Sequence, residues 1–84
     1  MFRIKHSVQT RTGEILSDET LAATFSQAGL ATPLIEELIS TFDKHGFDKR
    51  NGRWWASSKK RSGEIHFWWV FFEEDSLDND GNEG

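Results

Sequence analysis

With 84 residues and a net charge of −4, the sequence is long enough for one domain. It has no apolar run near the roughly 20 residues that a membrane span needs, so we expect no membrane association. The absence of cysteine excludes disulfides and thiolate metal sites. It also fits a reducing compartment, and the alternating N-terminus does not resemble a signal peptide, so we expect a cytoplasmic protein.

Residues 2–10 alternate apolar and polar side chains. Phe2 and Ile4 begin one face, and Arg3 and Lys5 begin the other. A period of two with one dry and one wet face is typical of a half-buried strand. We expect this strand at an edge of the sheet.

The next segment carries the signals of a helix over residues 18–28. Ser17 is a suitable N-cap, and Asp18 and Glu19 fall in the first turn, where the helix dipole favours acids. Gly29 suits a helix stop.

A second helix is predicted over residues 33–45. Thr32 is a good N-cap, and Pro33 at the first helical position loses only an amide that has no partner there. The apolar side chains that follow recur at helical spacing, and Gly46 is placed to end the helix.

Two strands follow. Asn51 and Gly52 form a turn signal that precedes a strand at 53–58. A longer strand is predicted at 64–73, because its β-branched and aromatic residues favour a strand over a helix.

The order of elements is therefore β-α-α-β-β. It predicts an α+β fold in which two helices pack on one face of a three-stranded antiparallel sheet. We expect one domain over residues 1–74, with strand 64–73 in the centre of the sheet. Residues 75–84 are acidic and nearly without apolar side chains, which predicts a disordered tail.

The last strand has two apolar faces. Ile65, Phe67, Trp69 and Phe71 point one way, and the residues between them are also mostly apolar. Two helices cover only one face, so the other would expose on the order of 300–600 Å², enough for a partner surface. The alternative is that a strong twist of the sheet, residues 11–16 or the acidic tail covers this second face. The predicted partner-binding residues are Trp54, Trp55, Trp68, Val70 and Phe72.

Basic residues gather beside this hairpin. Six of the ten Lys and Arg residues fall within residues 49–61, which contain no acid. Cations next to Trp rings suit single-stranded nucleic acid, although an ordinary solvated loop has the same composition. The predicted residues for nucleic acid or an acidic partner are Arg53, Lys59, Lys60 and Arg61.

An acidic surface supports a third hypothesis. Glu36, Glu37 and Asp43, together with residues 73–83, would let the chain act as a small inhibitor of the type that phages and mobile elements encode. Such an inhibitor would block a nucleic-acid-binding surface of a host complex.

Catalytic signatures are missing from the sequence. It has no Gly-rich phosphate loop, and its carboxylate pairs are adjacent rather than opposed. His6, His45 and His66 have no metal-ligand spacing. We therefore expect no metal, no cofactor and no small-molecule substrate. The favoured function is a non-enzymatic module that docks a protein partner or a second copy of itself, with nucleic acid binding as the alternative.

Overall fold

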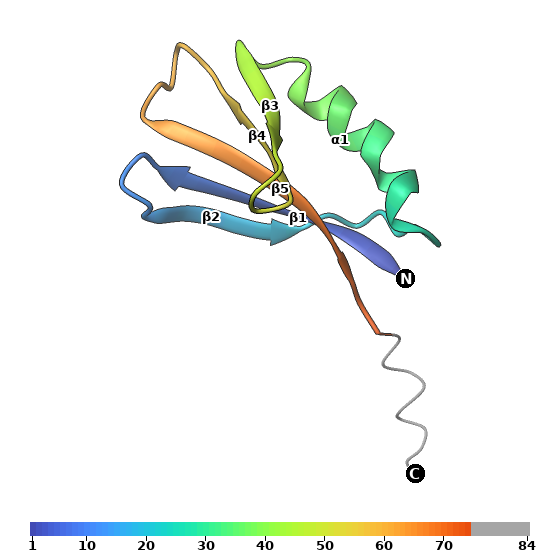
Figure 1. Ribbon diagram of the computed structural model, residues 1–84. Helices are drawn as coiled ribbons and strands as arrows, with labels where there is room; N and C mark the ends of the chain where they lie inside the picture. The colour runs from blue at the N-terminus through green and yellow to red at the C-terminus, as the bar shows by residue number, and fades with distance from the viewer. Residues whose placement is uncertain (75–84) are drawn as a thin grey trace.

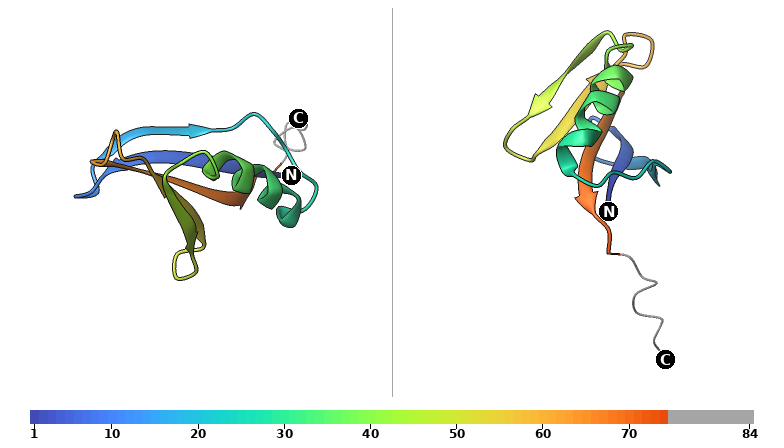
Figure 2. Two further views of the ribbon diagram at one scale, coloured as in Figure 1. Left: turned by 90° about the horizontal axis from the view of Figure 1, so that it is seen from above. Right: turned by 90° about the vertical axis from the view of Figure 1, so that its right-hand side faces the viewer.

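The computed structural model describes residues 1–74, which form a five-stranded antiparallel sheet and one short helical segment (Figure 1). The strands are β1 (Phe2–Thr10), β2 (Ile15–Thr20), β3 (Lys44–Asp48), β4 (Arg53–Ser57) and β5 (Glu64–Phe72). A 3-10 turn at Ala28–Ala31 leads directly into α1, Thr32–Ile39. α1 lies on one side of the sheet (Figure 2).

The centre of the sheet is the pairing of its first and last strands. The strand order is β2-β1-β5-β4-β3, so β1 and β5 are neighbours although they lie far apart in the sequence. They pair from Phe2 opposite Phe72 to Thr10 opposite Glu64, without a break in register. β2 extends the sheet from β1 as a hairpin, and β4 and β3 extend it from β5 as a meander.

The predicted three-stranded β-α-α-β-β fold is wrong, because both predicted helices lose residues to strands. Residues 15–20 form β2 rather than the start of a helix at 18–28. Asp18 and Glu19 contact Lys5 and His6 of β1 instead of capping a helix. Here a neighbouring strand outweighs a local helix signal. β1 is consequently an inner strand, not the predicted edge strand.

The second predicted helix, 33–45, is shorter than expected. α1 ends at Ile39, and β3 begins at Lys44. The hydroxyls of Ser40 and Thr41 donate to carbonyls one turn back, at 2.7 and 3.1 Å, which offers the chain an alternative to further helix. Gly46 does not stop a helix.

Gly46 instead lies in β3 beneath an indole. A Cβ at this position would lie 3.0 Å from Nε1 of Trp55. The glycine therefore allows the Trp55 ring to lie close to the β3 backbone.

The other strand predictions are confirmed within a residue. The strand at 2–10 is β1, the strand at 53–58 is β4, and the strand at 64–73 is β5. β5 is central, as expected. The predicted turn is present, with Gly52 at a φ of 66°.

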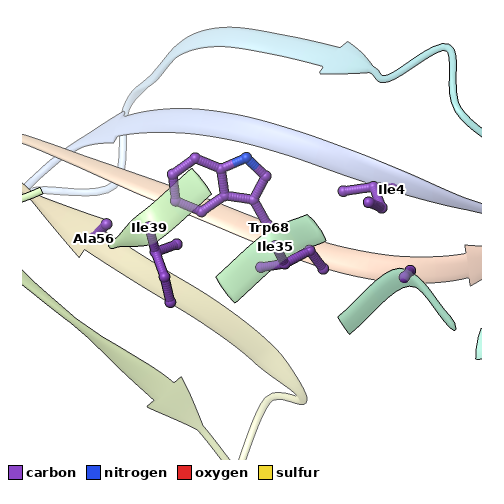
Figure 3. Packing of buried hydrophobic residues seen from close by; sticks show 6 residues of the cluster. Ile4, Ile35, Ile39, Ala56 and Trp68 are labelled. Atoms are coloured by element: carbon purple, nitrogen blue, oxygen red, sulfur yellow. The ribbon is translucent and has the colours of Figure 1, made fainter. Parts of the chain in front are cut away.

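The core lies between α1 and the sheet. Ile35 and Ile39 of α1 pack against Trp68 of β5, with Ile4 of β1 and Ala56 of β4 beside them (Figure 3). Ile4, Ile35 and Ala56 have no exposed surface. Because α1 is only eight residues long, these few side chains carry much of the contact between helix and sheet.

Replacing Ile35 with alanine should therefore lower the free energy of unfolding by about 2–5 kcal/mol, because it removes buried methyl groups and leaves a cavity. Urea unfolding followed by circular dichroism measures the change. The control is Leu30→Ala, at a side chain that is 54% exposed, which should change stability by less than about 0.5 kcal/mol. Equal effects of the two substitutions would contradict this account of the core.

Candidate functional site

Strand alternation gives the sheet one covered and one open face. Opposite residues in an antiparallel pair point to the same side. Trp54 pairs with Trp68, which is buried against α1, so the even-numbered positions of β4 and β5 face the helix. The odd-numbered positions face away from it.

The open face carries a continuous apolar strip. Trp55 of β4 pairs with Phe67 of β5, which places the two rings side by side. All members of the strip keep part of their surface exposed. We call this strip the aromatic face; its members are Trp55, Ile65, Phe67, Trp69 and Phe71.

Arg53 lies over the aromatic face. Its guanidinium carbon is 3.8 Å from the centroid of the Phe67 ring, which is a cation–π contact. Its Nε is 3.8 Å from Oδ2 of Asp48, and that nitrogen is buried without a hydrogen-bond acceptor among the described residues. The guanidinium is thus held over the Phe67 ring by the cation–π contact and by the nearby carboxylate of Asp48.

The β1 side of the aromatic face carries two more paired cations. Arg3 donates to Oε1 of Glu73 at 2.9 Å and also to the carbonyl of Leu21. Nζ of Lys5, which is opposite Trp69, lies 3.7 Å from Oδ1 of Asp18. Each cation that borders the rings from β1 or β4 therefore has a carboxylate of its own.

The predicted partner-binding residues divide between the two faces. Trp55 belongs to the aromatic face. Trp68 is only 4% exposed and belongs to the core, and Trp54 and Val70 pack against that core. Phe72 is 61% exposed, at the end of β5, with its ring edge-on to Phe2.

Sequence reasoning missed Ile65, Phe67, Trp69 and Phe71 as surface residues. Alternation along β5 assigns these four residues to one face and Trp68 and Val70 to the other. It does not indicate which of the two faces α1 covers, because that depends on the pairing of β1 with β5.

The four predicted basic residues do not form one cluster. Arg53 lies in β4, whereas Lys59, Lys60 and Arg61 lie in the exposed turn between β4 and β5. The backbone N–H of Lys59 donates to Asp43 at 2.7 Å, and Arg61 lies 3.4 Å from Glu64. This turn is at one end of the sheet rather than beside the centre of the aromatic face.

The predicted acidic surface is also divided. Glu36 and Glu37 are exposed on α1, while Asp43 holds the β4–β5 turn. The remaining part of the predicted acidic surface, residues 73–83, lies mostly outside the described residues. The predicted disordered tail at 75–84 lies outside them as well. The inhibitor hypothesis stays a prediction.

On the covered face, two of the three histidines meet. Nε2 of His6 lies 2.9 Å from Nδ1 of His66, and Nδ1 of His6 lies 3.0 Å from Oε2 of Glu19. Both rings lie nearly parallel to the indole of Trp68. They border a cavity of about 330 Å³ whose apolar walls include Phe42.

The hydrogen-bonded series Glu19–His6–His66 fixes the tautomers of both histidines. An ionised Glu19 accepts from Nδ1–H of His6, so Nε2 of a neutral His6 accepts and Nδ1 of His66 donates. The two nitrogens are much closer than the ring centroids, 5.1 Å apart, so the rings meet edge to edge. That geometry suits a hydrogen bond. Among the described residues, no three His, Asp or Glu side chains are arranged so that they could hold a metal ion.

No family model matches the chain, and neither curated proteins nor solved structures gave a match. Within residues 1–74, no helix is long and apolar enough to cross a membrane.

Stability should fall as the pH drops below about 6.5. Burial lowers the pKa of His66 from its ordinary 6.5, and His6 lowers it further, while Glu64 opposes the shift. Below pH 6.5 the unfolded chain therefore binds more protons at this site than the folded chain, so acid favours unfolding. His66→Gln should weaken this pH dependence.

Urea unfolding at about pH 7.5 and about pH 5.5 measures the effect. His45→Gln is the control, since His45 is exposed and outside the hydrogen-bonded chain. The same pH dependence in wild type and His66→Gln would count against the role of His66.

Proposed function

We propose that this chain is a non-enzymatic protein-interaction module that docks an apolar protein surface on its aromatic face. The observation that carries the proposal is the strip of partly exposed apolar side chains on the side of the sheet opposite α1. A sheet with one covered face leaves the other face for a second layer. We expect the module in the cytoplasm, in line with a sequence without cysteine.

The composition of the aromatic face supports a protein partner. Aromatic residues and Arg are enriched at the centres of protein interfaces, and Trp and Arg dominate their binding energy. Trp55 and Trp69 are the two indoles on this face, and Arg53 is already positioned over Phe67. These large side chains can be covered without a major rearrangement of the sheet.

The ion pairs argue against nucleic acid at this face. Phosphate binding depends on cations that exchange small counterions for the nucleic acid backbone. Here Arg3, Lys5 and Arg53 each lie within 4 Å of a carboxylate. A polyanion would have to compete with these carboxylates, whereas an apolar protein surface would not.

Trp69→Ala should weaken partner binding by about 30-fold, which corresponds to the roughly 2 kcal/mol that a central Trp contributes. The measurement compares wild-type and variant chains as baits in nuclease-treated native extract. Phe47→Ala is the matched control, because Phe47 is 47% exposed and pairs with Trp54 on the covered side.

Salt distinguishes the two classes of partner. Retention of a protein should change little between about 50 and 200 mM salt, whereas phosphate contacts weaken steeply over that range. Equal retention by wild type and Trp69→Ala would refute the proposal. A partner that is retained only from a parallel extract without nuclease treatment, and that elutes with salt, would show nucleic acid binding instead.

A further inference from the structure

We infer that the partner on the aromatic face is a second copy of this chain, packed face to face as a two-layer sheet dimer. This inference rests on the proposed function and narrows it to one occupant. It is argued from the charge pattern of the open face, from its area and from the nature of the sheet edges.

The charge pattern repeats on the two sides of β5. The centre of the face is apolar, the next strands contribute Lys5 from β1 and Arg53 from β4, and the outer strands contribute Asp18 from β2 and Asp48 from β3. Read from either edge of the sheet, the order is acid, base, apolar, base, acid. A two-fold axis superposes this order on itself, so acids lie opposite acids and bases opposite bases. The contact is possible because each of these bases already has an acid of its own copy within 4 Å, so the two copies bring together neutral pairs around an apolar strip.

The area allows a small dimer interface. The five strands together hold 34 residues, and strands about 4.8 Å apart with about 3.3 Å per residue give a face on the order of 540 Å² per copy. Two such faces total roughly 1,080 Å², which passes the roughly 1,000 Å² expected of a biological interface but lies below the standard value of about 1,600 Å², so the dimer should be weak and reversible. Sheets that pack face to face lie about 10 Å apart, a gap that aromatic side chains from both layers fill.

The edges of the sheet favour docking through the face. β2 presents Asp18 and Glu19, and β3 presents Lys44 and Asp48. Charged side chains on edge strands oppose pairing with the edge of another sheet. A face-to-face contact between two copies is also closed, since it uses the aromatic face of each copy.

Sedimentation equilibrium of the full 84-residue chain over a range of concentrations tests this inference. Wild type should show a reversible step to twice the mass of one chain. Trp69→Arg should weaken dimerisation at least 30-fold, because it places an unpaired charge at the centre of the contact. Leu30→Arg, at an exposed apolar residue outside the aromatic face, should dimerise like wild type.

Phe71→Arg is a second interface variant, and circular dichroism verifies that each variant is folded.

A mixture of a spin-labelled copy and an isotope-labelled copy locates the contact independently. A spin label on Gln9→Cys, which lies opposite Ile65 on β1, should broaden β5 amide signals of an isotope-labelled second copy. The chain has no native cysteine, so the label is unique.

Each outcome bears on the inference. A wild-type chain that stays monomeric overturns it, and so does a dimer that persists in both folded Arg variants. A monomer that still retains a protein from extract through Trp69 would refute the second copy but leave the proposed docking function standing. If wild type stays monomeric and Trp69→Ala retains as much protein from extract as wild type, the proposed docking function is refuted as well.

Discussion

The pairing of β1 with β5 is the constraint on which the rest of the structure depends. It joins the two ends of the domain in one nine-residue ladder, and every other strand adds to it from one side or the other. A shift of one residue in such a ladder would turn every side chain of one strand to the opposite face. The register therefore decides which aromatic residues of β5 are buried against the helix and which lie on the open face.

Adjacent residues of β5 consequently have different surroundings. Trp68 is enclosed by α1 and supports the hydrogen-bonded pair of His6 and His66. Trp69 lies on the other side, where Lys5 is its neighbour on β1. One tryptophan serves the core and the next serves the surface. The two apolar sides of the strand thus have separate roles, one in packing and one in the proposed docking.

Local patterns predicted the strands that are strongly apolar and well delimited. β1, β4 and β5 follow from alternation, from aromatic content and from the turn at Gly52. β2 and β3 did not follow, because Asp18 and Glu19 resemble a helix start and Gly46 resembles a helix stop. Those segments become strands through partners far along the chain, and a single sequence carries no direct signal of such pairing.

The sequence indicated an uncovered apolar face but identified only some of its residues, and the docking role of that face stays a proposal. Alternation showed that β5 has more apolar surface than a small domain covers with one helical layer. Trp68 and Val70, which were predicted as docking residues, lie on the side of the sheet on which the helix packs. Trp55 was the one predicted indole on the open face, next to Phe67.

The most direct test of this account is the register of β1 and β5 in solution. Cross-strand contacts between backbone protons, measured by nuclear magnetic resonance, report which residues are opposite one another. The account predicts contacts that pair Ile4 with Val70 and His6 with Trp68. A register displaced by one residue, with Lys5 opposite Trp68, would place the Trp69 side of β5 on the same face as Ile4 and contradict the assignment of the open face.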